Sequence, residues 1–347
     1  MVRGSASTKS VNMKDVAALA GVSVGTVSNV LNAPERVSEP TAQRVLTAID
    51  QLGWVPNESA RQLRTGRSQA VGLVVLDVAN PFFADVALGV ENVLYGYGYS
   101  VYIGNSDQQP EREDRLLRQF EQQPVRGVLL APIANVAEAA KQLRRRGIPI
   151  VMVDRARESD FCAVGVDDVE GGRVAAGHLI ECGHRRLAFV GGPHSLAQVR
   201  DRLTGAKQAM AALGGDGTLI SIPATALAIK PGVAAATEIA AMPVGERPTA
   251  VFAANDMLAI GLLQGFVAAG LRVPDDIALI GYDDIEFAAA SAVPLSSMRQ
   301  PRFEIGASAA RLLVDEIAAF DGGLAHVHEV IRLAPVLVPR ASTGCGS

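Results

Sequence analysis

The sequence predicts a small all-α domain at the N-terminus, followed by a larger α/β core of two parallel-sheet lobes. Short amphipathic segments separated by glycine-containing breaks fill residues 13–53, whereas short apolar runs alternate with longer amphipathic stretches from Ala70 onward. Nearly continuous apolar runs are typical of strands that helices cover on both faces. At 347 residues the chain is also too long for one ordinary core, so several compact units are expected.

Three short helices are expected in the first unit. Asn12 can cap a helix over 13–21, Gly21 suits a left-handed turn, and Ser23 can cap a second helix over 24–31. The third begins at Ser38 and ends at Gly53. The residues expected to face inward are Val16, Leu19, Ala20, Val27, Val30, Leu31, Val45, Ile49 and Leu52.

Two helices joined by a tight glycine-containing turn are the parts of a helix-turn-helix. The second helix leaves Val24, Gly25, Ser28 and Asn29 outside, a face small and polar enough to enter the major groove of DNA. The pattern by itself also allows a three-helix unit that binds no DNA. Charge favours the first interpretation, because residues 1–67 hold eight Lys and Arg against five Asp and Glu, whereas the rest holds 24 against 31.

Composition favours a soluble cytoplasmic protein. No apolar run reaches the ~20 residues that span a bilayer, and residues 1–10 lack the apolar stretch of a secretion signal. Cys162, Cys182 and Cys345 are scattered along the chain, so neither a disulfide framework nor a zinc site is expected. His326 and His328 alternate as ligands on a strand might, but no third ligand is near in sequence, and we expect no metal site.

Apolar runs expected to form strands recur through the core, with a split between two sheets near Asp167. They lie at 71–76, 100–104, 128–131, 150–153, 187–190, 250–253 and 277–281. Polar side chains follow many of them, as Asp154, Asn255 and Asp283 do. Ligands of open parallel sheets bind beyond the carboxyl ends of the strands, so we expect a small-molecule site there.

Carboxylates, amides and a guanidinium around a cleft suit a polyhydroxylated ligand, a sugar or sugar derivative. The single tryptophan, Trp54, lies outside the core, so Phe82, Phe83 or Tyr282 would have to stack on a sugar ring. Paired phenylalanines could equally hold a purine, which keeps a nucleoside or nucleobase as the alternative. Phosphate-binding and hydrolase motifs are absent from the sequence, and we expect no catalytic residues and no cofactor. A sugar-active enzyme or a binding protein is the remaining alternative.

The segment that reads MKDVAALAGVSVGTVSNVLNAPERVSEPTAQRVLTAIDQLGWVPN resembles the DNA-binding headpiece of the lac repressor (LacI/GalR) family almost position by position. The resemblance continues through the core, which is similar to a periplasmic sugar-binding protein. It implies base-reading residues at Val24, Gly25 and Asn29, with Thr26 and Ser28 nearby. Where the lac repressor has tyrosine and glutamine this chain has Val24 and Gly25, so a different operator sequence is expected.

Residues 58–68 form by composition a plain linker, but the resemblance implies a hinge helix. There Ala60, Leu63 and Arg64 would contact DNA, with Leu63 entering the minor groove. The implied effector contacts are Phe82, Phe83, Asp154, Arg202, Asn255, Asp283 and Gln300. The implied domains are the headpiece 11–57, the hinge helix 58–68, an N-terminal lobe of 69–167 with 300–330, and a C-terminal lobe of 168–299 with 331–341.

The resemblance therefore implies a sequence-specific transcriptional repressor. Its partners would be double-stranded operator DNA, a small-molecule effector that acts allosterically, and a second copy in a homodimer, with no membrane.

Overall fold

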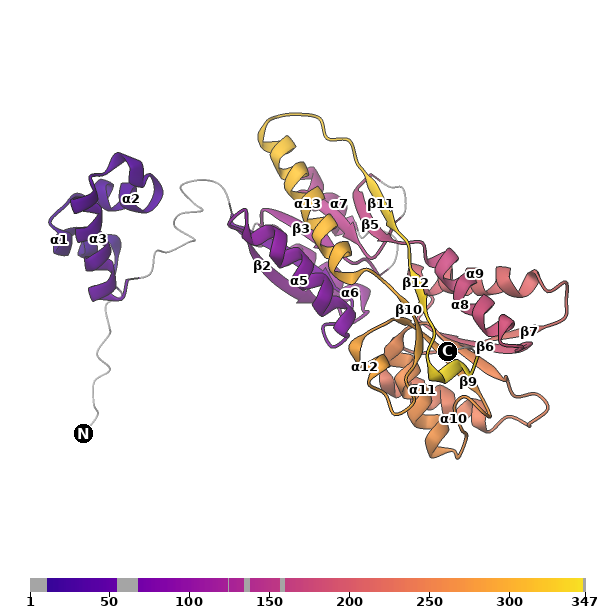
Figure 1. The fold of residues 1–347 in the computed structure, drawn as a ribbon. Helices are drawn as coiled ribbons and strands as arrows, with labels where there is room; N and C mark the ends of the chain where they lie inside the picture. The colour runs from indigo at the N-terminus through magenta and orange to yellow at the C-terminus, as the bar shows by residue number, and fades with distance from the viewer. Residues whose placement is uncertain (1–10, 55–67, 124, 134–137, 157–159, 346–347) are drawn as a thin grey trace, which may run out of the picture. The chain divides into compact units, whose positions relative to one another are not determined.

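The computed structural model describes residues 11–54, 68–123, 125–133, 138–156 and 160–345. The chain divides after Arg67 into two compact units, each described here by itself. In the first unit, α1 (Met13–Ala20), α2 (Val24–Asn32), η1 (Pro34–Arg36) and α3 (Glu39–Leu52) surround a small core (Figure 1). The predicted helix boundaries are confirmed to within two residues.

The predicted caps of the first unit are confirmed. The Asn12 side chain accepts a hydrogen bond from the Lys14 backbone N–H at 2.9 Å, and the Asp15 side chain accepts one from the Asn12 backbone N–H. Gly21 has a φ of 65°, the left-handed conformation that a side chain disfavours. The cap and the turn together fix the angle at which the chain enters α2.

One residue expected in this small core lies outside it. Leu19 is 50% exposed, because Val16, Ala17 and Ala20 form the face of α1 that packs on α3 and α2. Val27, Val30 and Val45 are buried as expected, and Trp54 packs against them. The single tryptophan is therefore part of the first unit's core.

The N-terminal lobe of the second unit contains a parallel six-stranded sheet of order β11-β5-β4-β3-β1-β2. Its strands are β1 (Ala70–Val75), β2 (Ser100–Asn105), β3 (Gly127–Leu130), β4 (Ile150–Val153), β5 (Cys162–Val166) and β11 (Val330–Leu333). Its helices are α5 (Pro81–Tyr95), α6 (Pro110–Gln122), α7 (Glu138–Arg145) and α13 (Arg302–Asp321). α13 returns from the other lobe and packs beside α5 (Figure 1).

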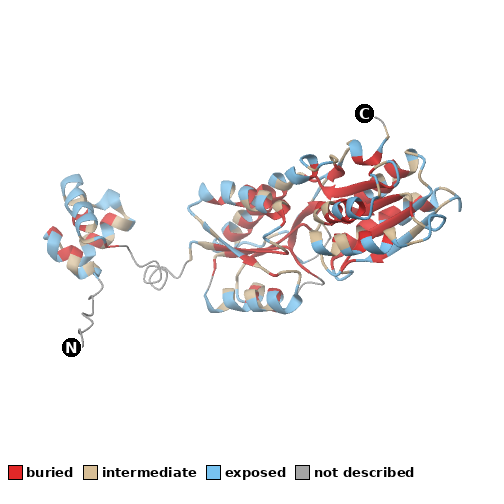
Figure 2. Ribbon diagram, turned by 90° about the horizontal axis from the view of Figure 1, so that it is seen from below, coloured by how far each residue is buried: buried red, intermediate tan, exposed pale blue. Residues whose placement is uncertain are grey.

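The C-terminal lobe contains a sheet of order β12-β10-β9-β8-β6-β7, parallel except for the β10–β12 pair. Its strands are β6 (Arg186–Gly191), β7 (Thr218–Pro223), β8 (Ala250–Ala253), β9 (Ala278–Asp283), β10 (Ser296–Arg299) and β12 (Val336–Val338). Its helices are α8 (Asp168–Glu181), α9 (Ala197–Ala211), α10 (Ile229–Ala240), α11 (Asp256–Ala268), α12 (Glu286–Ala289) and η2 (Ala341–Thr343). Figure 2 shows buried residues in the central strands of both lobes and on the helix faces that cover them.

The expected lobe boundary at residue 331 is wrong. Residues 330–333 form β11, whose Val330 pairs with Ala163 of β5, so this stretch belongs to the N-terminal lobe. The last crossing between the lobes in the described residues therefore falls at 334–335, just before β12. The apolar residues at 330–333 complete the open edge of β5, a pairing that sequence pattern cannot distinguish from pairing in the other sheet.

The cysteines also differ from expectation. Cys182, at the end of α8, and Cys345, after η2, are joined by a disulfide with a Cα–Cα distance of 5.3 Å. Their separation of 163 residues hides this proximity in the sequence. Cys162 is free and buried. Among the described residues, no helix is both long and apolar enough to cross a membrane.

Candidate functional sites

The outward face of α2 carries the predicted DNA-reading residues. Val24, Gly25 and Asn29 are exposed, whereas Thr26 and Ser28 are half-buried. Thr26 is partly engaged in the cap of α2, because its backbone N–H donates to Ser23 Oγ at 3.0 Å. Val24, Gly25 and Asn29 thus present a surface that a DNA groove could contact. Ala60, Leu63 and Arg64, predicted for the hinge helix, lie outside the described residues.

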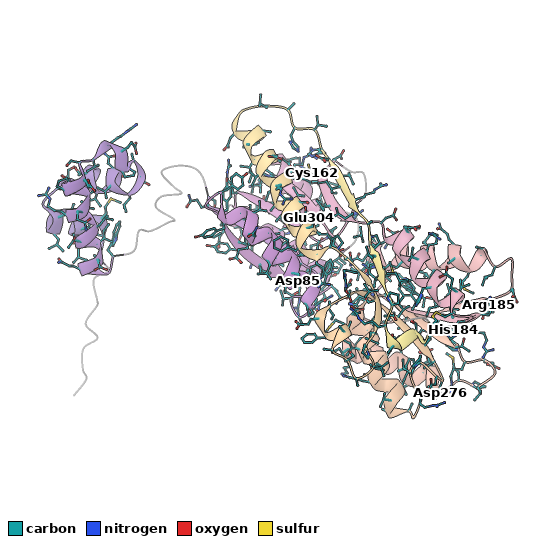
Figure 3. The ribbon with its side chains drawn as sticks, viewed as in Figure 1. Asp85, Cys162, His184, Arg185, Asp276 and Glu304 are labelled. Carbon is teal, nitrogen blue, oxygen red and sulfur yellow. A yellow bond between two sulfur atoms is a disulfide. The ribbon has the colours of Figure 1, made fainter. Side chains whose placement is uncertain are left out.

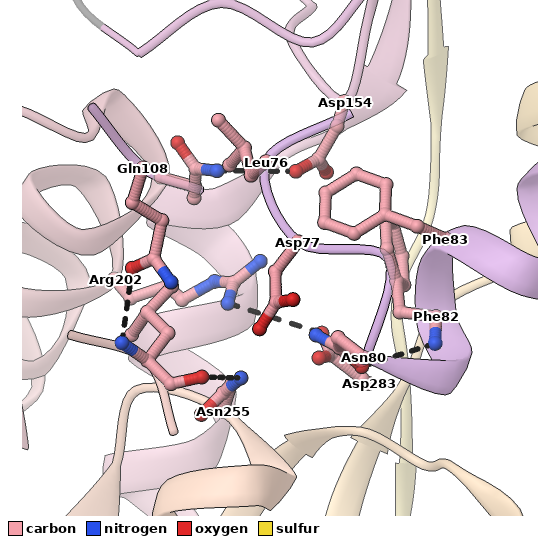
Figure 4. A pocket seen from close by; sticks show the side chains of 12 residues that line it. Leu76, Asp77, Asn80, Phe82, Phe83, Gln108, Asp154, Arg202, Asn255 and Asp283 are labelled. Carbon is pink, nitrogen blue, oxygen red and sulfur yellow. Dashed lines mark hydrogen bonds and ion pairs between the residues drawn. The ribbon is translucent and has the colours of Figure 1, made fainter. Parts of the chain in front are cut away.

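A cavity lies between the two lobes at the carboxyl ends of their strands (Figure 4). Its lining includes six of the predicted effector contacts and comes from both lobes. The lining residues are Leu76, Asp77, Asn80, Phe82, Phe83, Gln108, Asp154, Gln198, Arg202, Leu227, Asn255 and Asp283. The free volume is about 20 Å³, room for a single water molecule. A second cavity of about 350 Å³ adjoins it and shares Asp154 and Gln198.

Arg202 supplies the positive charge of the first cavity. Its side chain is 2% exposed and donates from Nε to Asp168 Oδ1 at 2.8 Å and from Nη1 to the Ala254 carbonyl at 2.7 Å. The guanidinium carbon lies 3.7 Å from the centre of the Tyr282 ring. Ion pairing and stacking together hold the guanidinium in one orientation before any ligand arrives.

Asp154 faces Arg202 from the opposite lobe, directly after β4. Its Oδ2 accepts a hydrogen bond across the cleft from Gln198 Nε2 at 3.1 Å, whereas its buried Oδ1 has no partner among the described residues. Burial, with the nearby Asp168 carboxylate, raises the pKa of Asp154 well above its ordinary value. A donor group on a ligand would satisfy this buried oxygen.

Asp283 ends β9 and adopts a φ of 108°, rare for a residue with a side chain. Burial raises its pKa to about 6, although the neighbouring Arg202 guanidinium opposes the shift. Gln300 donates to Asp283 Oδ1 at 2.7 Å and is 2% exposed. Gln300 is not among the residues that line the cavity; it contacts Asp283 instead and fixes its orientation.

Two predicted cleft residues also cap helices. Asn80 Oδ1 accepts from the Phe82 N–H at 3.0 Å at the start of α5, and Asn255 Oδ1 accepts from the Leu258 N–H at 3.0 Å at the start of α11. Phe82 and Phe83 follow Asn80 with ring centres 4.9 Å apart and planes at 90°. In this arrangement the two rings are perpendicular and cannot sandwich a flat ligand between them.

Sequence reasoning missed two amides that bridge the lobes. Gln198 lies four residues before Arg202, on the same face of α9, so helical spacing could have revealed it. Gln108 Oε1 accepts from the Leu227 N–H at 3.0 Å across the cleft. Gln108 lies in the turn after β2 and had no comparable signal in the sequence.

The described residues of the cavity are suited to binding a neutral molecule. Asp154 and Asp283 line it with one guanidinium, that of Arg202, and this guanidinium is already paired with the buried Asp168. Such a set favours a neutral ligand with several hydroxyl or N–H donors and disfavours an anion.

Two family models match the chain. The model described as bacterial regulatory proteins, lacI family, matches residues 12–57, and the model described as a periplasmic binding protein-like domain matches residues 176–343. Among similar curated proteins, the HTH-type transcriptional repressor PurR of Photobacterium profundum is 35% identical over 333 residues. That match covers 95% of this chain and 98% of the relative.

Solved structures agree with these matches. A complex of the transcriptional regulator CelR with cellobiose has a TM-score of 0.69 at 33% identity, and covers 96% of this chain and 99% of that chain. The lac repressor dimer bound to operator and the anti-inducer ONPF has a TM-score of 0.80 at 26% identity, with the same coverage.

A helix-turn-helix unit joined to a two-lobed body with a polar interlobe cleft defines a class of protein: the transcriptional regulator that responds to a small-molecule effector. The matches extend over nearly the whole length of both this chain and its relatives. The chain belongs to the lacI family of bacterial regulatory proteins.

Proposed function

We propose that this chain is a homodimeric, non-enzymatic repressor that binds operator DNA through α2 and responds to a neutral sugar held between its lobes. The observation that carries the effector class is the buried, unpartnered Oδ1 of Asp154 beside an acceptor-rich cavity, among the residues that the structure describes. A sugar hydroxyl could donate to that oxygen while accepting from Gln198 or Arg202. The cellobiose complex of the similar regulator CelR supports the same class.

A phosphorylated effector is disfavoured by the charges of the cleft. A phosphate would have to lie beside the buried Asp154 and Asp283 with only Arg202 of the described lining to balance it, and Arg202 is already paired with Asp168. A nucleoside carries enough donors to compete with a sugar, but the perpendicular Phe82 and Phe83 rings give it no ready stacking slot.

The small volume of the cavity suggests how the effector acts. Gln198 bonds to Asp154, and Gln108 bonds to Leu227, so that the lobes are held together across the cleft. A ligand larger than water must separate or rearrange these contacts, which changes the angle between the lobes. DNA affinity then changes by the difference in ligand affinity between the two arrangements, typically ~1–3 kcal/mol per coupled site.

The test is a thermal-shift screen of the full chain against neutral sugars, sugar phosphates and nucleosides. Each stabilising compound is then measured for its effect on binding to a labelled duplex from the chain's own promoter region. We expect a neutral sugar to raise the melting temperature and to change DNA affinity at least ~5-fold. If only sugar phosphates or only nucleosides act, the sugar assignment is wrong; if no duplex is bound selectively, the repressor assignment is wrong.

A pair of variants on α9 locates the effector. Arg202→Lys should abolish the ligand-induced shift, because lysine cannot reproduce the paired and stacked geometry of the guanidinium. Arg200→Lys is the matched control: Arg200 is exposed and bonds to the carbonyls of His194 and Ser195, outside the cavity. An equal loss of response in both variants would place the effector elsewhere.

A further inference from the structure

A cluster of four side chains with metal-binding chemistry lies in the N-terminal lobe, away from the cleft. Cys162 begins β5, Glu316 lies in the second half of α13, and His326 and His328 lie in the connection from α13 to β11 (Figure 3 labels Cys162). One ligand atom from each residue lies within 4.8 Å of the other three. The fold thus brings a thiol and a carboxylate from two distant segments to the two histidines, a grouping of four ligands that the sequence did not predict.

The distances within this cluster are close to those of a tetrahedral site. Cys162 Sγ lies 3.1 Å from His326 Nε2 and 3.6 Å from His328 Nδ1. Ligand atoms around a tetrahedral zinc ion lie about 3.3–3.8 Å apart, given bonds of about 2.0–2.3 Å. Every pair of ligand atoms in the cluster lies within 4.8 Å, which is at most about one ångström beyond this range.

Glu316 gives an independent indication of a missing partner. The residue is 7% exposed, and its Oε2 has no hydrogen-bond partner among the described residues. Burial raises the pKa of Glu316 to about 7, and the neighbouring Arg144 lowers it only in part. A buried carboxylate oxygen without a donor is costly, and a cation would remove that cost.

We propose that Cys162, Glu316, His326 and His328 bind one Zn²⁺ ion. A thiolate, two imidazoles and a carboxylate are ligands that zinc takes in a closed, four-coordinate structural site. On binding, the Cys162 thiol loses its proton to solvent, and the thiolate and carboxylate charges balance the ion. The ion would tie α13 and its return connection to β5, just before the chain crosses to the other lobe.

Arg144 is the group that competes with the metal. Its Nη2 lies 2.7 Å from His328 Nε2, and it also bonds to the Asp160 carbonyl. A guanidinium can only donate, so this contact uses the Nε2 lone pair and leaves the proton on Nδ1, the atom that faces Cys162. Coordination through Nδ1 therefore requires Arg144 to withdraw from His328.

The test uses tag-free full-length protein, reduced and freed of metal by chelator dialysis. Zn²⁺ is titrated against a competing chelator, and Co²⁺ is used as a coloured probe. We expect one Zn²⁺ per chain, a higher melting temperature with zinc, and a thiolate-to-cobalt charge-transfer band with the visible bands of tetrahedral cobalt. Cys162→Ser should abolish the charge-transfer band, and His326→Asn should weaken zinc binding by roughly 100-fold.

Controls distinguish this cluster from a second cluster of histidine and cysteine side chains among the described residues. His178, Cys182 and Cys345 also lie within 4.8 Å of one another, and reduction of the disulfide would free both thiols. Cys182→Ser should leave the cobalt spectrum unchanged, as should His194→Asn at an exposed histidine. A band that survives Cys162→Ser and disappears in Cys182→Ser would overturn the proposal, as would the absence of any bound metal.

A substitution of Arg144 tests the proposal by an expected rise in zinc affinity. Arg144→Gln removes the competing donor and leaves His328 Nε2–H free to donate to water, so zinc affinity should rise by about 10-fold. Arg145→Gln is the matched control, because Arg145 is exposed and pairs with Glu138 instead. Unchanged affinity in Arg144→Gln, with binding still lost in Cys162→Ser, would mean that His328 is not a ligand and would overturn the four-residue site.

Discussion

Buried carboxylates at the ends of strands make the cleft costly to fold, and Asp283 shows the cost most clearly. Its pKa of about 6 lies above the ordinary 3.8, so the folded protein binds this proton more tightly than the unfolded chain does. The associated stability is fully present below about pH 4 and is lost as pH rises through 6. The shift corresponds to at most about 3 kcal/mol.

Asp283→Asn should therefore stabilise the protein at neutral pH. Asparagine resembles the protonated acid, so the melting temperature of the variant should exceed that of the parent at pH 8, with the difference vanishing near pH 4. Asp276→Asn is a control of opposite sign, because hydrogen bonds from Arg272 hold the pKa of Asp276 at about 2. Its removal should lower the melting temperature slightly at pH 8. An Asp283 variant less stable than the parent at pH 8 would contradict the prediction.

Asn29 is the residue of α2 best suited to read a base. An exposed asparagine can form two hydrogen bonds with adenine, worth ~1–3 kcal/mol, so Asn29→Ala should weaken operator binding by at least about 5-fold and relax specificity at one base pair. Fluorescence anisotropy with operator variants measures both effects. Asn32→Ala should bind as the parent does, because the Asn32 amide already donates to the Ser28 carbonyl. Equal losses in the two variants would remove Asn29 from the interface.

The sequence predicted well those cleft residues whose position follows from a strand. Asp154 comes directly after β4 and Asp283 is the last residue of β9, and parallel strands gather their carboxyl ends at one edge. The sequence could not predict that Gln300 contacts Asp283 and does not line the cavity. That difference depends on the direction of the side chain, which the sequence pattern does not report. Leu19 was wrongly assigned to the core because the apolar residues of α1 are compatible with two neighbouring orientations of the helix. In the observed orientation Ala17 is buried and Leu19 is exposed.

Contacts between elements that are far apart in the chain could not be predicted from the sequence. β11 pairs with β5 in the register of Val330 with Ala163, although the two strands lie far apart in the chain and β12, in the other sheet, follows β11 almost at once. The same pairing brings His328 to Cys162, which is why two histidines with no third ligand near them in sequence have a thiol and a carboxylate beside them. The spacing of apolar residues predicts local secondary structure. It does not predict which sheet edge a strand joins, and the contacts described above depend on that pairing.

The disulfide from α8 to the C-terminal segment should contribute measurably to stability. Closing a loop of this length lowers the entropy of the unfolded chain by an amount worth roughly 5 kcal/mol in the chain-entropy account. Dithiothreitol should therefore lower the melting temperature of the parent, and Cys182→Ser should lower it equally. The variant should show no further change on reduction. If the reductant has no effect on the parent, the two thiols are not bonded in solution.

At the scale of the whole molecule, α5, the turn after it and the edge strand β2 carry several exposed apolar side chains. Leu88, Tyr95, Tyr97, Tyr102 and Ile103 are each more than half exposed, and β2 is the last strand of its sheet. An open edge beside aromatic side chains is a liability that proteins usually cover. The lac repressor, to which this chain is similar, was solved as a dimer on its operator, and in the homodimer proposed above a second copy would cover these side chains.

A charged residue introduced among these exposed side chains should then prevent dimerisation and weaken DNA binding at the same time. Tyr95 is 82% exposed, so Tyr95→Glu should leave the fold intact, produce a monomer in sedimentation, and weaken operator binding by orders of magnitude, because a monomer contacts one half-site. Val244→Glu, at a residue 79% exposed in the C-terminal lobe, should change neither property. A Tyr95 variant that stays dimeric would place the interface elsewhere. A monomer that binds the full operator as tightly as the parent does would show that the two headpieces do not act together.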